Sequence, residues 1–354
     1  MSSTFWKLRQ SITSLALCAV STVALGIFNS PALHAAGYSL TNLVGDLNFG
    51  GNIIDPNLVN AWGMVVLPNN SFWVNANGTS LSGVYEADGT PTGTYIEIDD
   101  DPSGVVMNKS GFNVSNGGKA QPSTFLFATE EGTILGWSSK LNTPAAITMV
   151  DNSDFEAVYK GLAVVGSTLY AADFKGGVVD MYNSKWQWVG AFTDSQVPFG
   201  FGPFNIVAIN NQLYVSFALI DGFGPDDIDD QPGDGNGFVD VFSSSGKFVK
   251  RLVSGGALNS PWGMALAPKS FGTFSGDLLV GNFGDGTINA FNLKTGAFAG
   301  TVSDSNGTPI VIDGLWALEF GTQKVGKSTV PVLYFSAGPN GENDGVVGTI
   351  KANP

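Results

Sequence analysis

The chain has 354 residues and a formal net charge of −14, with 16 Lys and Arg against 30 Asp and Glu. This acidic balance makes nucleic acid and anionic membrane surfaces poor partners, because both carry negative charge. Charged residues make up only 13% of the chain, whereas glycine occurs 47 times. The turns must therefore be made by Gly, Asn, Asp and Pro, which indicates an all-β chain with many tight connections.

Residues 1–36 have the pattern of a secretory signal peptide. Lys7 and Arg9 supply positive charge, Ile12–Phe28 is largely apolar and uncharged, and Pro31–Ala36 offers small residues for cleavage. We expect a secreted or periplasmic protein. An uncleaved membrane anchor is the alternative, since the apolar run is close to the shortest length that spans a bilayer.

Cleavage would leave residues 37–354 as a single domain without cysteine or histidine, because Cys18 and His34 are the only such residues. That domain can form no disulfide, no Ser-His-Asp triad, no haem site and no metal site built on His or Cys. Loss of Lys7 and Arg9 takes the basic residues from 16 to 14 against 30 acidic ones, a formal charge of −16.

The expected partners of residues 37–354 are therefore cations, neutral polar small molecules such as saccharides, or a protein. We expect no nucleotide cofactor, no nucleic acid partner and no membrane contact after cleavage. The domain is expected to be a monomer.

Six apolar runs, most of them opening on a small or polar residue, are predicted first strands of a repeated unit. They are Ala61–Val66, Pro102–Met107, Lys160–Val165, Phe204–Ile209, Pro261–Leu266 and Asp313–Leu318. We align them on Gly63, Gly104, Gly161, Asn205, Gly263 and Gly314. A second and a third strand follow each first strand, and Asp277–Thr301 spells three consecutive strands separated by two glycine-bearing turns. The spacing of the units fits the length of one four-stranded propeller blade.

A fourth strand is predicted in five units and is missing from the last. Tyr38–Val44 belongs to no unit, so we predict that it pairs with Val346–Ile350 and closes the ring, which removes an exposed sheet edge. The sequence therefore predicts an all-β, six-bladed β-propeller of four-stranded antiparallel blades, closed by an N-terminal strand. A β-sandwich, a jelly roll and a seven-bladed propeller are the alternatives.

Three segments resemble repeats of the NHL type and of gluconolactonase-like six-bladed propellers: Leu169–Tyr182, Gly237–Leu252 and Leu278–Phe298. The whole of residues 37–350 is also similar to a family of uncharacterised exported bacterial proteins, some of which end in a PEP-CTERM sorting tail. The runs that carry this likeness are Asp55–Met64, Phe127–Trp137, Gly235–Phe242 and Asn259–Pro268. The resemblance implies a propeller and export, and it implies no settled activity.

In a propeller, the loops before first strands and those between second and third strands open at one mouth of the central tunnel. One predicted ring there is Asn60, Asp101, Lys160, Asn205, Ser260 and Asp313, and a second is Asn77, Glu130, Asp173, Asp221, Asn282 and Asn340. Of these, Glu130, Asp173, Asn205, Asn282 and Asp313 are the candidate ligand residues. Their oxygens would suit Ca²⁺ or a polyol, although Asn and Asp beside Gly also make tight turns.

A second candidate is the acidic insertion Asp221–Asp240, in which Asp226, Asp227, Asp229, Asp230 and Asp234 are the candidate calcium ligands. Its spacing differs from the EF-hand pattern, and a solvated acidic loop is the alternative interpretation. Loops of this length are more often functional than merely connecting.

Two classes of function stay open. The first is an extracytoplasmic binding or interaction module that uses the loop-rich tunnel face, stabilised by calcium. The second is a metal-dependent lactonase or esterase resembling gluconolactonases, in which the ion polarises a carbonyl or activates water. No catalytic residue is assigned, because no Glu, Asn, Asn, Asp ligand set appears in the order that those enzymes use.

Overall fold

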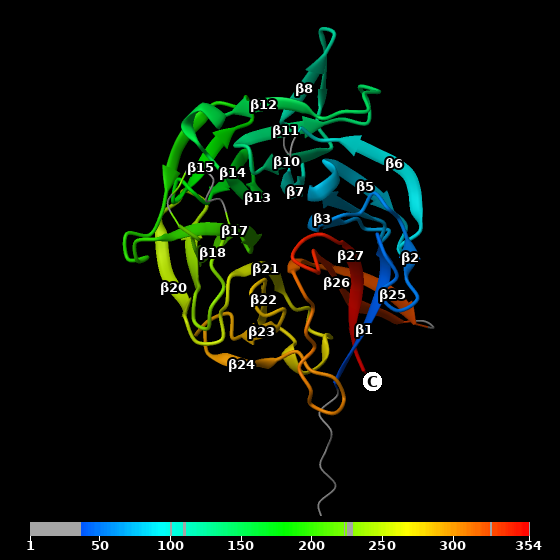
Figure 1. Ribbon diagram of the computed structural model, residues 1–354. Coiled ribbons are helices and arrows are strands. Elements are labelled where there is room, and N and C mark those ends of the chain that lie inside the picture. The colour runs from blue at the N-terminus through cyan, green and yellow to red at the C-terminus, as the bar shows by residue number, and fades with distance from the viewer. Residues whose placement is uncertain are drawn as a thin grey trace, which may run out of the picture. The chain divides into compact units, whose positions relative to one another are not determined.

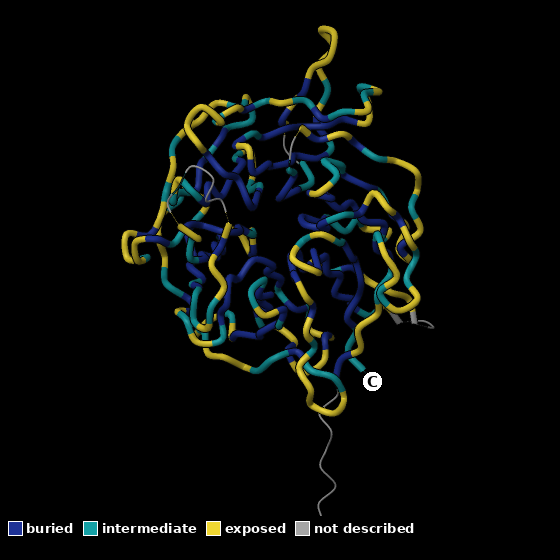
Figure 2. The backbone as a smooth tube through the Cα atoms, viewed as in Figure 1, coloured by how far each residue is buried: buried dark blue, intermediate teal, exposed yellow. Residues whose placement is uncertain are grey.

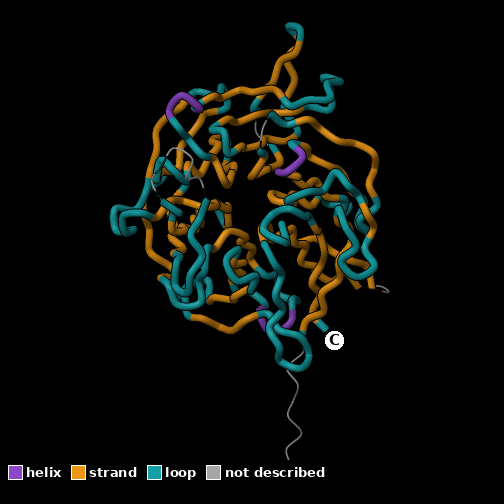
Figure 3. Tube along the Cα trace, viewed as in Figure 1, coloured by secondary structure: helices purple, strands orange, loops and turns teal. Residues whose placement is uncertain are grey.

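The computed structural model describes residues 37–99, 101–108, 111–222, 224, 229–325 and 328–353. The predicted signal peptide, residues 1–36, lies outside the described residues. Six antiparallel sheets lie around one axis, and each contributes its first strand to the centre (Figure 1). The prediction of a six-bladed propeller is confirmed. Nearly all the described chain is strand or loop (Figure 3).

The six sheets follow one another along the chain. The first blade consists of β3 (Ala61–Val66), β4 (Phe72–Ala76), β5 (Leu81–Tyr85) and β6 (Pro91–Glu97). The second consists of β7 (Pro102–Met107), β10 (Phe125–Thr129), β11 (Thr133–Trp137) and β12 (Ile147–Asp151). The third consists of β13 (Tyr159–Val165), β14 (Thr168–Asp173), β15 (Val178–Asn183) and β16 (Trp188–Phe192). The fourth blade consists of β17 (Phe201–Ile209), β18 (Gln212–Leu219), β19 (Phe238–Ser243) and β20 (Phe248–Ser254). The fifth consists of β21 (Pro261–Leu266), β22 (Leu278–Asn282), β23 (Ile288–Phe291) and β24 (Phe298–Thr301).

The sixth blade joins the two ends of the propeller domain, as predicted. It consists of β25 (Leu315–Val325), β26 (Ser328–Ala337) and β27 (Val346–Ala352), with β1 (Tyr38–Gly45) as its outer strand and β2 (Ile53–Ile54) beside β1. Strands β1 and β27 are antiparallel, with Tyr38 opposite Ala352 and Gly45 opposite Val346. The Tyr38 hydroxyl donates to the Phe271 carbonyl oxygen at 3.1 Å, which ties the closing strand to the fifth blade.

The hydrophobic core of the described residues is divided among six clusters, most of whose members come from neighbouring blades. The inner strands are buried and the outer strands and loops are exposed (Figure 2). The cluster between the first two blades shows the pattern, because Trp73 packs against Phe125 at 4.3 Å and against Trp137 at 5.3 Å between ring centroids. Adjacent blades are therefore held together by aromatic and aliphatic contacts.

Several of the glycines used to align the first strands mark places where neighbouring blades approach closely. A β-carbon on Gly63 would lie 2.3 Å from the Ser103 carbonyl oxygen, and one on Gly263 would lie 2.4 Å from that of Trp316. Only glycine fits at such distances. In the fourth blade Asn205 stands in this position, and its side-chain amide donates to the Trp262 carbonyl oxygen at 2.8 Å.

The structure changes the prediction in two places. In the first and fifth blades a tryptophan directly precedes the aligned glycine. The equivalent tryptophan of the sixth blade is Trp316, so Ala317 occupies the aligned position there, and Gly314 does not. Gly314 instead makes a turn with a φ of 65°. A hairpin of β8 (Asn113–Asn116) and β9 (Lys119–Pro122), absent from the prediction, is inserted in the second blade and projects outward (Figure 1).

The helices among the described residues are the short 3₁₀ turns η1 (Asn77–Thr79), η2 (Ser153–Phe155) and η3 (Gly272–Phe274). Within the part of the chain that the structure describes, no helix has the length and apolar character needed to cross a membrane.

Candidate functional site

The residues directly before the aligned positions form an inner layer across the tunnel. They are Trp62, Ser103, Lys160, Phe204, Trp262 and Trp316. The rings of Trp62 and Trp316 stack with centroids 3.9 Å apart, and Trp262 meets Trp316 edge-on at 5.8 Å. All three tryptophans are buried. This layer therefore closes the tunnel, and Lys160 is its one charged member.

The Lys160 ammonium is buried and ion-paired. The side chain is only 1% exposed, and its Nζ bonds to Oε1 of Glu130, which is also buried. Nζ also lies 4.9 Å from the centroid of the Trp62 ring and 3.8 Å from Oδ1 of Asp229. Burial alone would lower the pKa of Lys160, but the carboxylates of Glu130, Asp229 and Asp230 together outweigh burial and hold the pKa above its ordinary value. Lys160 is therefore a fixed cation and not a neutral nucleophile.

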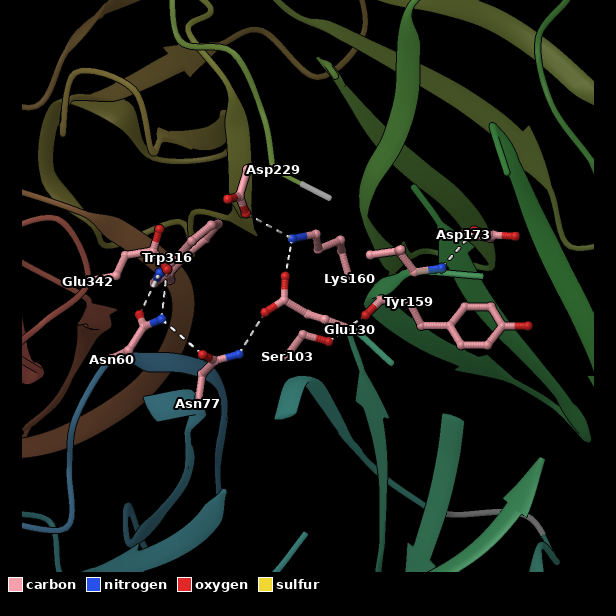
Figure 4. A network of polar contacts seen from close by, with 11 residues as sticks. Asn60, Asn77, Ser103, Glu130, Tyr159, Lys160, Asp173, Asp229, Trp316 and Glu342 are labelled. Carbon is pink, nitrogen blue, oxygen red and sulfur yellow. Dashed lines mark hydrogen bonds and ion pairs between the residues drawn. The ribbon is translucent and has the colours of Figure 1, made fainter. Parts of the chain in front are cut away.

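A chain of hydrogen bonds runs from this ion pair across the mouth of the tunnel (Figure 4). The Asn77 amide donates to Oε2 of Glu130 at 2.9 Å, and the Asn60 amide donates to Oδ1 of Asn77 at 3.2 Å and to Oε2 of Glu342 at 2.7 Å. The Trp316 indole donates to Oδ1 of Asn60 at 3.2 Å. We call the set Asn60, Asn77, Glu130, Lys160, Asp229 and Glu342 the polar mouth.

The polar mouth is built from five blades, and the backbone conformation explains why Asn60 is one of its residues. Asn60 precedes a first strand and has a φ of 49°, as Ser260 does with 48° and Asp101 with 26°. Asn, Asp and Gly tolerate this left-handed conformation best, so turn geometry selects these polar residue types at the mouth. Asn60 therefore makes a turn and also belongs to the polar mouth.

The exposed rim of the polar mouth is acidic. Asp229 is 74% exposed, whereas burial raises the pKa of Glu342 to about 7 and that of Asp230 to about 6. Oδ2 of Asp230 is buried and has no hydrogen-bond partner among the described residues. A partner that brings hydroxyl or ammonium donors would therefore be favoured here, and an anionic one would be repelled.

Of the five predicted tunnel-mouth ligands, only Glu130 lies in the polar mouth. Asp173 accepts the backbone N–H groups of Val158 and Gly176 at 3.1 and 2.9 Å, and burial raises its pKa to about 6. Asn205 joins two blades through its bond to the Trp262 carbonyl oxygen. Both residues therefore have structural roles in the described fold.

The other two predicted ligands also stabilise turns. The Asn282 amide donates to the Ala257 carbonyl oxygen at 2.8 Å, and Asp313 accepts the Asn340 N–H at 2.9 Å. Oδ1 of Asn282 is buried without a partner among the described residues. These contacts agree with the turn-forming alternative and do not join Asn282 or Asp313 to the polar mouth.

The predicted calcium ligands fall into three groups. Asp226 and Asp227 lie outside the described residues. Asp229 and Asp230 lie beside Lys160, and Asp234 is an exposed turn residue. Among the residues that the structure describes, no group of three or more His, Cys, Asp and Glu side chains is arranged to hold a metal ion. Calcium binding by this loop stays a prediction.

The sequence pattern did not point to Glu342, a mouth residue whose pKa is raised by burial to about 7. It follows the predicted ring residue Asn340 by two positions in the loop between β26 and β27, and its partner Asn60 is 282 residues away in the sequence. Ring closure brings them together. Because Asn340 was predicted at the mouth, the Glu342 carboxylate two residues later could have been predicted there as well.

The raised carboxyl pKa values predict that the protein is more stable in mild acid than in mild base. Burial raises the pKa values of Asp173, Asp230 and Glu342 above their ordinary 3.8, 3.8 and 4.5, so the folded state holds protons that the unfolded chain releases. This stabilisation is complete below about pH 4 and is lost as the pH rises through 6 to 7. For each carboxyl, a difference of one pKa unit between the folded and unfolded states changes the free energy of unfolding by about 1.4 kcal/mol.

We expect a melting temperature a few degrees higher at pH 5 than at pH 8, measured by scanning calorimetry. Glu342→Gln should reduce this difference, whereas Glu131→Gln, at an exposed position, should leave it unchanged. Equal stability at the two pH values would show that these carboxyls are not buried as described.

The fold and the site define a six-bladed propeller with a closed inner layer and a polar, acidic mouth. Solved structures of the same fold include virginiamycin B lyase from Staphylococcus aureus, with a TM-score of 0.50, 8% identity and coverage of 89% of this chain and 99% of that one. Luciferin-regenerating enzyme has a TM-score of 0.53, 12% identity and coverage of 83% and 92%. At such identities the likeness shows the fold alone. No protein-family profile matches the chain.

Two uncharacterised proteins of Acanthamoeba polyphaga mimivirus are much more similar in sequence. One is 33% identical over 336 residues, covering 90% of this chain and 87% of the viral protein. The other is 32% identical over 312 residues, covering 84% and 76%. The chain belongs to the family of these mimivirus proteins.

The predicted membership of an uncharacterised exported bacterial family was therefore wrong, because these curated relatives are viral. The runs that suggested it, such as Asn259–Pro268, contain the first strand and its close-packing glycine. Propeller geometry imposes that pattern, so it identifies the fold better than the family. The likeness to NHL-type repeats concerns the propeller fold only.

Proposed function

We propose that the protein is an exported binding module and that its polar mouth recognises a neutral or amino-substituted saccharide. The observation that carries this proposal is the convergence of side chains from five blades, far apart in sequence, on one hydrogen-bonded group. Amide groups both donate and accept hydrogen bonds and carboxylates accept them. Such a set matches the hydroxyl groups of a sugar.

The charge of the polar mouth narrows the ligand class. Glu130 neutralises Lys160, and both are buried, so the acidic rim is formed by the exposed Asp229 and the partly buried Glu342. A phosphate or carboxylate group would meet negative charge there. An ammonium group would be attracted, which favours amino sugars over acidic sugars.

The arrangement supports binding over metal-dependent hydrolysis. In the hydrolase hypothesis, carboxylates converge on a cation at the tunnel mouth. Here Glu130 and Asp229 converge instead on the Lys160 ammonium, a cation supplied by the chain itself. The described residues of the polar mouth thus offer no second cluster of carboxylates for an ion.

The test is a panel of neutral, amino and acidic saccharides, screened on a glycan array and measured by titration calorimetry. Asp229→Asn should weaken the best saccharide about tenfold, the size expected for one charge-assisted hydrogen bond. The matched control is Asp234→Asn, because Asp234 is an exposed acidic residue of the same loop outside the polar mouth. Preferential binding of acidic saccharides, or equal effects of the two variants, would contradict the proposal.

A further inference from the structure

A small cavity lies between the sixth blade and the first, which are neighbours where the ring closes (Figure 1). It has a volume of about 280 Å³ and is lined by β1, β25, β26 and β27 and by two turns of the first blade. These turns join β3 to β4 and β5 to β6, so they lie at the end of the blades opposite the polar mouth. We call this space the closure cavity. It has room for a molecule of about ten non-hydrogen atoms.

The wall of the closure cavity carries two hydroxyl groups without hydrogen-bond partners among the described residues. Tyr334 and Thr349 are opposite each other on β26 and β27 and therefore lie on the same face of the blade. Both are buried, and Oγ1 of Thr349 has no partner. Burial raises the pKa of Tyr334, and no hydrogen bond of the described structure offsets it. A buried hydroxyl without a partner costs free energy, so both groups favour a ligand that supplies acceptor oxygens.

Two lysines give the closure cavity a positive charge. Lys351 lies two residues after Thr349 on the same face of β27, and Lys324 lies on β25. Neither forms an ion pair with a carboxylate among the described residues. Asp88 is the only acidic residue of the described lining, and its Oδ1 already accepts the Thr90 N–H at 3.0 Å. Two lysines and one aspartate leave the lining with a net charge of +1.

The acidic polar mouth is too distant to cancel this local charge. Five residues of extended strand separate Lys351 from Val346, where β27 leaves the mouth, and they span about 17 Å. Exposed charges more than about 8 Å apart are largely screened at physiological salt. The net charge of −14 for the whole chain therefore does not exclude an anion from the closure cavity.

We infer that the closure cavity binds a small oxyanion, namely a phosphate or carboxylate group on a molecule of about ten non-hydrogen atoms. The ammonium groups of Lys324 and Lys351 neutralise the anion. The hydroxyl groups of Tyr334 and Thr349 donate to its oxygens, and the aliphatic side chain of Leu43 contacts its carbon atoms. This site goes beyond the proposed saccharide function and is independent of it, because it lies at the other end of the blades and selects the opposite charge.

The charge preference is tested with three probes of similar size, namely glycerol 3-phosphate, glycerate and glycerol, titrated into the full chain and followed by NMR. At least one of the two anions should bind about tenfold more tightly than glycerol, and the tighter anion identifies the group that the site takes. Lys351→Gln should remove this preference. The control is Lys269→Gln, at an exposed position outside the lining, which should keep it. Equal binding of all three probes, or equal effects of the two variants, would overturn the inference.

The location is tested by removing one hydroxyl group. Tyr334→Phe keeps the buried ring and should leave the melting temperature unchanged, but it should weaken the tighter anion about fivefold. The control is Tyr214→Phe, because Tyr214 is equally buried and its pKa is also raised by burial alone, in a different blade. It should bind the anion as the parent does. Saccharide binding by the polar mouth should be unchanged in both variants. Anion binding that is unaffected by Tyr334→Phe would place the site elsewhere.

Discussion

Replacing Lys160 with methionine is expected to lower the free energy of unfolding by about 3 to 5 kcal/mol. The substitution removes the ammonium but leaves Glu130, only 8% exposed, in the same buried place. A buried carboxylate without its cation must either lose its charge or remain unpaired, and both cost free energy. The fall should appear in urea unfolding as a lower midpoint with an unchanged slope.

Two controls separate this effect from a general loss of lysine. Lys175 pairs with the exposed Glu156 at 3.2 Å, so Lys175→Met should cost less than about 1 kcal/mol. The double variant Lys160→Met with Glu130→Gln should recover much of the lost stability, because no buried charge remains. A Lys160→Met protein within about 1 kcal/mol of the parent would contradict the described ion pair.

Deleting Tyr38–Asp46 is expected to lower the melting temperature by about 10 °C or more. The deletion removes the outer strand of the sixth blade and exposes the edge of β27. It also removes the fully buried Val44, and the Tyr38 ring that stacks on Phe274 at 5.9 Å. Scanning calorimetry and light scattering should show both the lower stability and a tendency to associate through the new edge.

The matched control is excision of residues 113–122, a segment of similar length that forms the projecting β8–β9 hairpin. The flanking residues are already neighbours, because the Ser123 N–H donates to the Phe112 carbonyl oxygen at 2.8 Å. Removal of the hairpin takes away the buried Val114 and the Asn113 carbonyl that accepts from the Trp186 indole. It leaves the ring closed, so it should cost less stability than the loss of β1. If both deletions had the same effect, strand β1 would not be closing the ring.

The fold could be predicted because each blade repeats the same local requirements. A turn residue, a small close-packing residue and an apolar run recur in this order. The N-terminal strand that begins at Tyr38 belongs to no repeat unit, and it supplies the strand that the last unit lacks. The hairpin β8–β9 could not be predicted in this way, since it occurs in only one blade. The wrong alignment on Gly314 came from giving the glycine more weight than the tryptophan, whereas Trp316 occupies the inner layer together with Trp62 and Trp262.

The candidate site was predicted less completely, because its contacts depend on the ring and not on local pattern. Asn60 and Glu130 were predicted at the tunnel mouth and belong to its hydrogen-bonded group. Asp173 and Asp313 were predicted there by the same turn chemistry and make local turn contacts instead. Which of these side chains meet depends on the blade that each faces. The link from Asn60 to Glu342 is an interaction across the closure of the ring, so no local spacing encodes it.

Saccharide binding by the polar mouth is tested most directly by a crystal structure of the protein with the tightest-binding saccharide from the panel. We predict that sugar hydroxyl or ammonium groups lie within about 2.7 to 3.2 Å of the carboxylates of Asp229 and Glu342. A sugar bound on the outer strands or on the β8–β9 hairpin, with these two carboxylates free of contact, would contradict the proposed function.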